Sequence, residues 1–492
     1  MNDNNPFANQ ARDLASRTTT ENGAIARRHT TNPLVDLFGV IGALREDVLT
    51  GSTDRLYRLI DCAYHEDKNL LAKMIFYSRD VRGGLGERET FRTMIRYCAE
   101  KYPEVIESNI KYIPEYGRWD DVLSLIGTPL EEKMWDFVKR VFDEDLYTVN
   151  TGGNNISLLA KWLPSADASS ENTRKKGCYV AKKLGMTVYE YKRDVKAIRR
   201  VINTIESHIS AKDWNTYDYS KVPSNAMLKY TNAFKRNDGE RYAQYIADVS
   251  KGKATIHSAT LFPSDIIRRL KPFDDNSTCQ ELWNALPNYV EGENNYLVMA
   301  DVSGSMSGTP MDVSIGLALY FAERNKGPFK NLFMTFSANP LFVEIPEHYS
   351  LYEKYRLALG SDWGYNTNLE AAFRSILALA KSTHATQDEL PKSLIIITDM
   401  EFDRAMFSDK PFFDEMKDRF AEAGYEMPNV VFWNVDSRQD TYHAKADEPR
   451  VQLVSGKSTS TFKLLIEGLN KTPYELMLQA LSDKRYDPIT VE

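Results

Sequence analysis

An apolar run that ends in the loop Asp301-Val-Ser-Gly-Ser305 constrains the fold of this chain more than any other stretch. The run 296–302 is typical of a buried strand, and residues 311–323 after the loop have the pattern of a helix. The loop places the oxygen-bearing side chains of Asp301, Ser303 and Ser305 on alternate residues of one tight turn. They can therefore converge on one point, and hard cations such as Mg²⁺ take oxygen ligands. The stretch predicts a strand, a metal-binding loop and a helix.

Two distant segments add oxygen atoms to the same predicted site. Thr367 stands at the start of a predicted helix over 368–381, and Asp399 ends a second buried-type strand over 393–399. In an open α/β sheet, ligands bind in the crevice outside the carboxyl ends of the strands. The alternative is an ordinary Ser/Gly turn with a helix-capping threonine. We expect five side chains at one metal site: Asp301, Ser303, Ser305, Thr367 and Asp399.

In this order and context, the five side chains resemble the metal-ion-dependent adhesion site of von Willebrand factor A domains. The resemblance covers the chain from about residue 295 onwards. It implies Mg²⁺ or another divalent cation, bound by three hydroxyls and, partly through waters, by the two carboxylates. It also implies one coordination position left open for the carboxylate of a protein partner. The segment Thr398-Asp399-Met400 departs from the Ser-Asp-Gly of many A domains, which puts the rim of the site in doubt.

The rest of the C-terminal region alternates strand-like and helix-like segments. Strands are predicted at 296–302, 331–337, 341–345, 393–399, 430–435 and 450–454. Helices are predicted at 311–324, 368–381, 414–423, 461–467 and 474–482. Long crossovers that contain helices require parallel strands, and the short segment 341–345 is expected to be an antiparallel edge. We predict a Rossmann-like α/β domain with a mostly parallel sheet over residues 294–492.

The first 290 residues have helical periodicity. From residue 33 onwards, apolar residues recur at three- and four-residue spacing, and short loops with Gly or Pro separate the amphipathic segments. Successive short helices with one apolar face each predict stacked helical hairpins, without a sequence repeat of fixed length. The predicted organisation is an extended N-terminal arm (1–32), a helical-repeat domain (33–293) and the A-like domain (294–492).

The composition is that of a globular cytoplasmic protein. Hydrophobic residues make up 42% of the chain and charged residues 27%. No apolar run approaches the roughly 20 residues that cross a bilayer, so no membrane association is expected. The polar N-terminus lacks the basic and apolar regions of a secretory signal. The four cysteines are far apart, which argues for a reducing compartment and against disulfides or a zinc site.

A basic segment inside the helical region is the candidate RNA interface. The net charge of the chain is −7, but lysine and arginine are dense between residues 174 and 253. In a helix predicted over 188–208, the spacing places Arg193, Lys196 and Arg200 on one face, where they could neutralise phosphates. The alternative is that this row of charges is simply a solvated helix face. The candidate RNA-binding residues are Arg174, Lys175, Lys176, Lys192, Arg193, Lys196, Arg199 and Arg200.

Two loops of the N-terminal half have distinctive composition. The segment 78–88 combines arginines, an aspartate and three glycines between two helices. It could form a backbone nest for a phosphate or carboxylate, or a helix–helix turn held by an Arg–Asp pair. It lacks the Lys and Ser/Thr of a P-loop and follows no strand, so nucleotide binding is not predicted. Asp120 and Asp121 stand at a predicted helix start, which favours a capping role.

Short motifs run through the N-terminal half: Thr20-Glu-Asn-Gly23, Arg79-Asp-Val-Arg-Gly-Gly84, Pro114-Glu-Tyr-Gly-Arg-Trp-Asp-Asp121 and Lys161-Trp-Leu-Pro164. They resemble the TROVE module of the Ro and telomerase-associated RNA-binding proteins. They are still more similar to an uncharacterised domain family of plants, fungi, bacteria and large phages, in which the helical region runs into a von Willebrand A domain. The resemblance implies a ring of HEAT-like repeats closed by that domain. In Ro proteins such a ring holds single-stranded RNA ends in its hole and structured RNA on its basic outer face.

The residues do not indicate a catalytic centre. No candidate base accompanies Ser303 or Ser305, and the A-domain resemblance implies a binding device. We expect a non-catalytic RNA-binding scaffold whose A domain binds Mg²⁺. The alternative is a metal-dependent protein-interaction adaptor that binds an acidic partner residue and whose helices are purely structural. A third hypothesis, a metal-dependent nuclease, fails if the purified protein with Mg²⁺ leaves labelled RNA intact.

Overall fold

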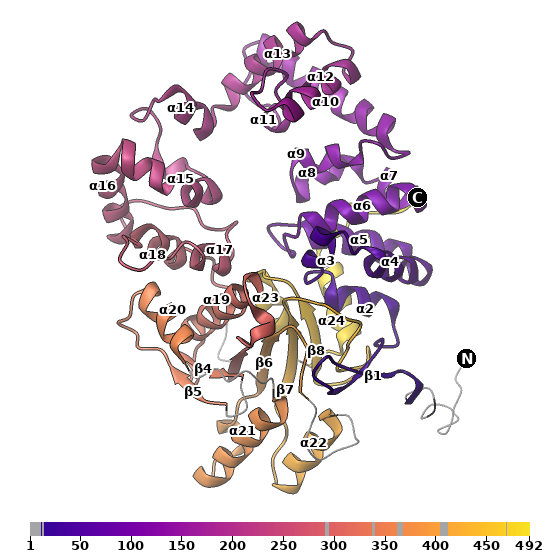
Figure 1. Cartoon of the computed structure of the whole chain (residues 1–492), viewed down its shortest axis with the longest axis vertical. Coiled ribbons are helices and arrows are strands. Elements are labelled where there is room, and N and C mark those ends of the chain that lie inside the picture. Colours follow the sequence, from indigo (N-terminus) through magenta and orange to yellow (C-terminus); the bar gives the residue numbers. More distant parts are fainter. Residues whose placement is uncertain are drawn as a thin grey trace.

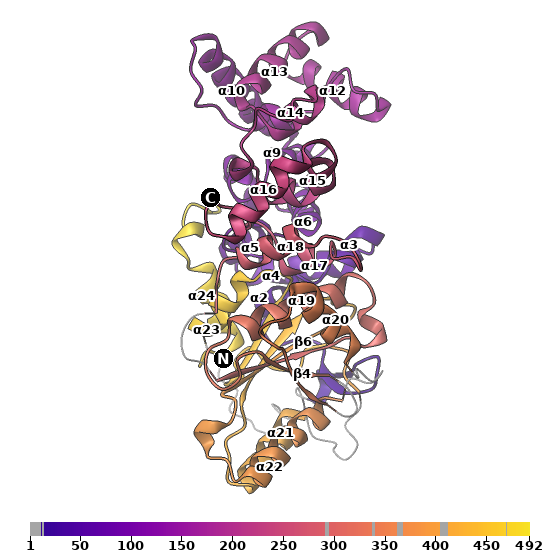
Figure 2. The same cartoon turned by 90° about the vertical axis from the view of Figure 1, so that its left-hand side faces the viewer.

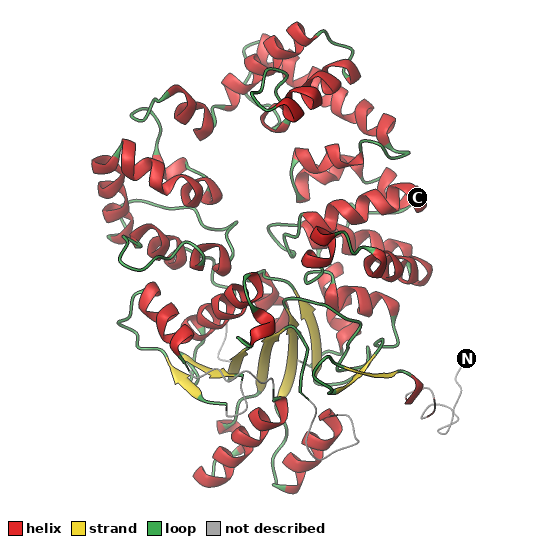
Figure 3. Ribbon diagram, viewed as in Figure 1, coloured by secondary structure: helices red, strands yellow, loops and turns green. Residues whose placement is uncertain are grey.

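The chain folds into a helical region followed by an α/β domain, which confirms the predicted fold class (Figure 3). The computed structural model describes residues 11, 14–290, 295–336, 340–361, 368–403, 412–468 and 470–492. None of the helices in these ranges combines the length and the apolar character that a membrane span needs.

A short hairpin precedes the helices. Strand β1 (Arg17–Thr19) pairs antiparallel with β2 (Ile25–Arg27), inside the segment predicted to be an extended arm. Each strand has only three residues. Sequence periodicity could not identify these strands, because three residues are too few to show the alternation of apolar and polar residues that marks a strand.

The helical region consists of short amphipathic helices, each with one buried stripe. In α4, for example, the buried residues Leu56, Leu59, Ile60 and Ala63 recur at the spacing of one helix face. The helices are α2 (Pro33–Val40), α3 (Arg45–Thr50), α4 (Asp54–Glu66), α5 (Lys68–Arg79), α6 (Glu89–Lys101), α7 (Pro103–Glu107), α8 (Ile113–Tyr116), α9 (Trp119–Val122), α10 (Glu131–Asn150), α11 (Leu159–Trp162), α12 (Glu171–Lys183), α13 (Val188–Ile202), α14 (Ile205–Ala211), α15 (Ser224–Asn237), α16 (Gly239–Ser250), α17 (Pro263–Ile267) and α18 (Ser277–Asn284). Single 3-10 turns are η1 (Ile110–Tyr112), η2 (Leu123–Leu125) and η3 (Tyr219–Lys221).

The α/β domain is built on a six-stranded sheet. Its strands are β3 (Tyr296–Ala300), β4 (Leu332–Thr335), β5 (Phe342–Glu344), β6 (Ser393–Thr398), β7 (Asn429–Asn434) and β8 (Val451–Ser455). The strand order is β5-β4-β3-β6-β7-β8, and only β5 pairs antiparallel with its neighbour. All six predicted strands and the antiparallel edge are therefore confirmed.

Helices cover both faces of this sheet. They are α19 (Thr309–Arg324), α20 (Leu351–Gly360), α21 (Leu369–Thr383), α22 (Phe412–Glu422), α23 (Ser460–Glu467) and α24 (Pro473–Leu481), with 3-10 turns η4 (Gly304–Met306), η5 (Gln387–Glu389) and η6 (Lys484–Tyr486). Along β3, Leu297 and Met299 join the core that contains α21 and α22, whereas Val298 and Ala300 join the core that contains α19 and α23. The strand is thus buried on both faces, as a parallel strand must be.

The helical region forms a ring with the sheet domain (Figure 1), which Figure 2 presents edge-on. One end docks through α2 against β8, and the other through α17 against α19. Two hydrophobic cores follow from this arrangement. The first extends from α2 to Ile198 of α13 and reaches one face of the sheet; the second starts at Ile205 of α14 and reaches the other face. The sheet domain therefore holds the two arms of the ring together.

The C-terminal tail fastens the loop 78–88 to the sheet domain. The guanidinium of Arg485 pairs with Asp80, with its Nη2 at 2.9 Å from Oδ1, and the hydroxyl of Tyr486 donates to Oδ2 at 3.1 Å. The Arg82 N–H also donates to Asp80, at 3.0 Å. Neither interpretation of this loop holds as stated: the carboxylate beside the loop is the chain's own Asp80, and the arginine that pairs with it is Arg485 of the tail and not an arginine of the loop.

Candidate metal centre and basic surface

The predicted metal ligands gather where the strand order reverses. Strand β3 lies between β4 and β6, so the chain leaves β3 toward one side and later returns on the other. Asp301 directly follows β3 and Asp399 directly follows β6, and the Asp301 N–H still donates to the carbonyl of Ile397 at 2.9 Å. The two acids therefore stand at the carboxyl ends of adjacent parallel strands, where open α/β sheets bind ligands.

Hydrogen bonds orient the first strand end. The fully buried Asp301 accepts the Ser303 N–H at 2.8 Å through Oδ1 and the Thr398 hydroxyl at 2.6 Å through Oδ2. The Ser303 and Ser305 hydroxyl oxygens lie 2.9 Å apart. Three of the predicted ligands are thus brought together on one loop, with both hydroxyls on the same side.

The second acid is buried but incompletely satisfied. Asp399 Oδ1 accepts the Glu401 N–H at 3.2 Å, whereas Oδ2 is buried and has no hydrogen-bond partner in the described part of the chain. Burial, and next the charge of Asp399, raise the pKa of Asp301 to about 7. Two buried carboxylates this close repel each other when both are ionised, and a divalent cation would offset that repulsion.

The donor set fits a hard cation. Two carboxylates and two serine hydroxyls are the oxygen ligands that Mg²⁺ takes. The fifth predicted ligand, Thr367, belongs to the range 362–367 and lies outside the described residues. In those residues, no group of three or more His, Cys, Asp or Glu side chains could hold a metal ion by itself. A divalent cation bound here would supply a coordination position for an oxygen of a partner molecule.

In the segment after β6, at the rim of the site, Met400 adopts a backbone conformation that is typical of glycine. Met400 has φ of 69°, in the left-handed region that side chains with a β-carbon rarely occupy. Its N–H donates to the Thr398 hydroxyl at 3.2 Å, and its carbonyl lies 3.0 Å from Nε2 of His443. Burial lowers the pKa of His443 to about 4, so the ring is neutral at pH 7. This network holds the substituted segment 398–400 in place.

The N-terminal turn 20–23 docks on the same rim, which the sequence did not reveal. The Thr20 hydroxyl donates to the carbonyl of Phe402 at 2.6 Å. The Glu21 N–H donates to the Glu401 carboxylate at 2.6 Å, and the Asn22 amide donates to the Glu401 carbonyl at 2.7 Å. The motif itself was visible, but its partner lies 382 residues away and only the fold brings them together.

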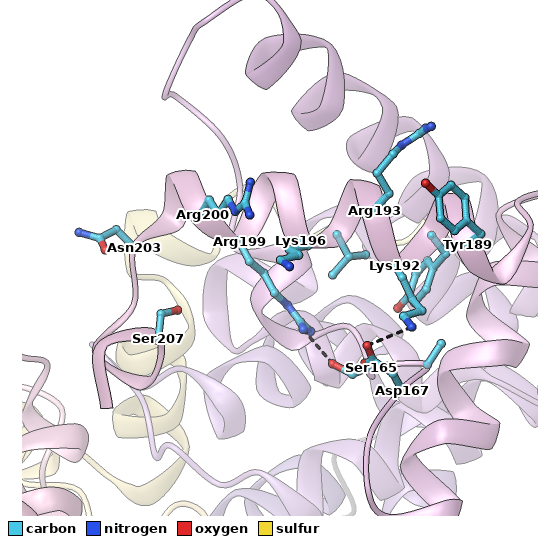
Figure 4. Close-up of a pocket in the computed structure, with 13 residues that line it drawn as sticks. Ser165, Asp167, Tyr189, Lys192, Arg193, Lys196, Arg199, Arg200, Asn203 and Ser207 are labelled. Atoms are coloured by element: carbon cyan, nitrogen blue, oxygen red, sulfur yellow. Dashed lines mark hydrogen bonds and ion pairs between the residues drawn. The ribbon is translucent and has the colours of Figure 1, made fainter. Parts of the chain in front are cut away.

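The candidate RNA-binding helix is α13, which begins in a capping box formed by Thr187 and Glu190. Its buried face consists of Tyr191, Asp194, Val195 and Ile198. Beside it is a hollow of about 730 Å³ (Figure 4). Five of the eight predicted cations line this hollow: Lys192, Arg193, Lys196, Arg199 and Arg200.

These five cations differ in what they contact. The guanidinium of Arg199 turns inward (Figure 4) and donates to the Ala160 carbonyl at 2.8 Å, the Ser165 hydroxyl at 2.8 Å and the Leu163 carbonyl at 2.7 Å. Burial lowers its pKa. Arg199 thus holds α13 to the segment after α11, and its donors are not free to bind phosphate.

Two cations of α13 are paired with acids and two are not. Lys192 lies 3.3 Å from Asp167, and Arg193 lies 2.7 Å from Asp194. By contrast, Lys196 and Arg200 are exposed and form no ion pair within the described ranges. These two side chains are the ones free to meet an external anion.

The remaining three predicted cations lie on α12 and do not line the hollow. Arg174, Lys175 and Lys176 are all exposed. Arg174 donates to the Ala168 carbonyl at 3.2 Å, and Lys175 pairs at 2.8 Å with the glutamate four residues before it. They form a second basic patch on the neighbouring helix.

Eight other residues line the hollow and were not predicted, among them Tyr189, Asn203 and Ser207. Tyr189 is 76% exposed, which is unusual for an aromatic side chain. The sequence signal was its position three and four residues before Lys192 and Arg193, on the face that the cations share. Its exposure could not be deduced, because it depends on how α13 packs on the helices beneath it.

Comparisons with known proteins divide the chain at the same place as the fold. Residues 20–143 and 168–295 match a family described as a domain of unknown function, DUF2828, and residues 295–486 match a second, DUF7788. The chain is also 27% identical over 524 residues to the uncharacterized protein L728 of Acanthamoeba polyphaga mimivirus. That similarity covers 97% of this chain and 89% of the viral protein. Because the first match spans more than half of its residues, the chain belongs to the DUF2828 family.

Proposed function

We propose that this chain is a non-catalytic RNA-binding scaffold that resembles Ro proteins. In this proposal, the ring is a TROVE-like array of HEAT-like helices, and the α/β domain is a von Willebrand factor A domain that binds Mg²⁺ or another divalent cation. The ligand is a small structured RNA or a single-stranded RNA end, and the basic surface of α13 binds it.

The observation that carries the proposal is the pair of exposed cations, Lys196 and Arg200, beside the hollow of about 730 Å³. Cations without an internal partner are available to neutralise phosphates, which supplies much of the affinity for nucleic acids. The exposed ring of Tyr189 on the same hollow can stack on a base. Cations that were all paired with acids of the chain would not be available to phosphates in this way.

The test is a gel-shift titration with a labelled RNA pool at two salt concentrations. We expect Lys196→Glu with Arg200→Glu to weaken RNA retention at least tenfold and to lower the salt dependence, because two phosphate contacts are lost. The matched control is Lys381→Glu with Lys417→Glu, which makes the same charge change on exposed lysines of α21 and α22 in the α/β domain. Equal retention by both double variants would contradict the assignment of this surface.

A second candidate function is a metal-dependent adaptor that binds an acidic residue of a protein partner. The buried Asp399 Oδ2 without a hydrogen bond supports it, because such an atom fits a cation-binding site better than a structural one. The adaptor predicts partner capture that EDTA or Asp301→Ala abolishes, and no nucleic acid that copurifies. RNA in the purified protein, retained after EDTA, would favour the first candidate.

A further inference from the structure

Arg438 brings a positive charge of the chain itself to the metal centre. Its Nη2 lies 3.8 Å from Asp399 Oδ2, the buried oxygen without a hydrogen bond. The same nitrogen donates to the carbonyl of Ser305 and lies 3.2 Å from Asp436 Oδ2. Arg438 thus contacts the loops after β3, β6 and β7 at once.

The loop that carries Arg438 is anchored on the helical region. Asp440 accepts the Arg55 Nε–H at 2.7 Å and also pairs with Arg58, both on α4. Arg55 further donates to the Ser437 carbonyl at 2.9 Å and to its hydroxyl at 2.7 Å. The loop 436–440 therefore joins the metal centre on one side to the first arm of the ring on the other.

A guanidinium and a divalent cation at this centre would be attracted by the same carboxylate. Two like charges so close together repel each other, and the repulsion is strong where burial reduces screening by water. Asp399 can be neutralised by Arg438 or by a metal ion, and each weakens the hold of the other. Only 34% of the Arg438 side chain is exposed, and its contacts with the Ser305 carbonyl and with Asp436 hold the guanidinium beside Asp399.

We propose that Arg438 is a resident counter-charge that competes with the divalent cation for Asp399, and that the loop 436–440 couples metal binding to the docking of α4. The inference rests on the metal centre of the proposed function. It adds that metal affinity is set by an arginine outside the ligand set. It also adds that the cation and the contact between ring and sheet domain influence each other, since such coupling is reciprocal.

The test is direct binding of Mn²⁺, as a stand-in for Mg²⁺, to the full chain, with the free ion followed by electron paramagnetic resonance. We expect Arg438→Gln to bind Mn²⁺ about tenfold more tightly than the wild type, because the competing charge is gone. Arg356→Gln is the matched control: it removes the same charge from an exposed position on α20 and should leave affinity unchanged. Asp440→Asn, which loosens the loop from α4, should tighten binding by a smaller factor.

The outcomes separate this inference from the proposal on which it rests. Unchanged or weaker binding by Arg438→Gln, with binding lost in Asp301→Ala, would overturn the counter-charge and leave the metal centre standing. No binding by any variant would overturn both. Hydrogen exchange of α4 supplies a second readout: Mn²⁺ should change exchange in residues 54–66 of the wild type but not of Arg438→Gln. An α4 that does not respond to the metal in the wild type would refute the coupling.

Discussion

Asp121 in the helical region and Asp399 in the α/β domain are equally buried, with exposed fractions of 0% and 1%. They differ in how their oxygens are satisfied. Asp121 Oδ2 accepts from Arg79 Nε at 2.8 Å, and Oδ1 accepts from Arg92 Nε at 2.7 Å. Asp399 has one hydrogen bond, from the Glu401 N–H, and its second oxygen has none in the described part of the chain.

The difference distinguishes a structural carboxylate from a candidate ligand. Burying a carboxylate is costly unless cations and hydrogen bonds compensate it. Around Asp121 the chain supplies that compensation itself, so the acid fastens α5, α6 and α9 together. Around Asp399 the compensation is incomplete, so binding of a divalent cation there would be favourable. Burial alone therefore does not mark Asp399 as a candidate ligand; the oxygen without a hydrogen bond supports that interpretation.

The largest expected effect follows from removing the charge of Asp121, the structural carboxylate of the two. Asp121→Asn leaves the buried Arg79 without a charged partner and should lower the free energy of unfolding by about 4 kcal/mol. Urea denaturation followed by tryptophan fluorescence measures it. A loss below about 1 kcal/mol would mean that the ion pairs around Asp121 are not what holds these helices together.

Asp399→Asn is the matched control for that substitution. It removes a charge that repels Asp301 and also one that attracts Arg438, which keeps its contact with Asp436. These two effects oppose each other, so in the absence of metal the free energy of unfolding should change by less than about 1 kcal/mol. Any stabilisation by Mg²⁺ should disappear in the same variant, because binding to the folded state alone raises stability by mass action. A stability loss as large as that of Asp121→Asn would remove the distinction between the two acids.

The next effect concerns pH. His443 has a pKa of about 4 in the folded chain, against 6.5 for a free imidazole. Between these values the unfolded chain binds a proton that the folded chain does not. Its contribution is therefore fully present above pH 6.5 and decreases by up to about 3 kcal/mol as the pH falls to 4. His443→Gln keeps an N–H donor without titrating, and should flatten unfolding curves recorded across this range. An unchanged pH dependence would show that His443 is not the group responsible.

The smallest effect distinguishes the inward-facing cation of the basic surface, Arg199, from an exposed one, Lys196. Arg199→Ala leaves three acceptors without their donor and should cost about 2 kcal/mol of stability. Lys196→Ala, three residues before Arg199 and without an ion pair among the described residues, should change stability by less than about 0.5 kcal/mol. Thermal unfolding of the two variants measures the difference. Equal midpoints would mean that Arg199 is as free as Lys196.

Local patterns were sufficient for the strands of the α/β domain. Its strands are apolar runs with clear ends, and Asp301 and Asp399 could be placed at adjacent strand ends because parallel topology brings carboxyl ends together. Helix α20 was missed, although Ser350 and Glu353 form a capping box that marked its start. The β1–β2 hairpin was missed because its strands are too short to have a period. For the basic helix, spacing placed Lys196 but not Arg199 on the shared face, and it could not predict that Arg199 turns inward to donate to three acceptors.

The sequence by itself determined the order of elements, the sheet with its one antiparallel edge, and the type of atoms at the strand ends. These depend on periodicity and on neighbours in the chain, which a sequence contains directly. Only the tertiary structure decided which charges are satisfied: that Asp80 fills its own loop, that Arg199 turns inward, and that Arg438 reaches Asp399. Partners so far apart in the chain meet through packing, and packing decides whether a charged group is compensated from within or open to a ligand.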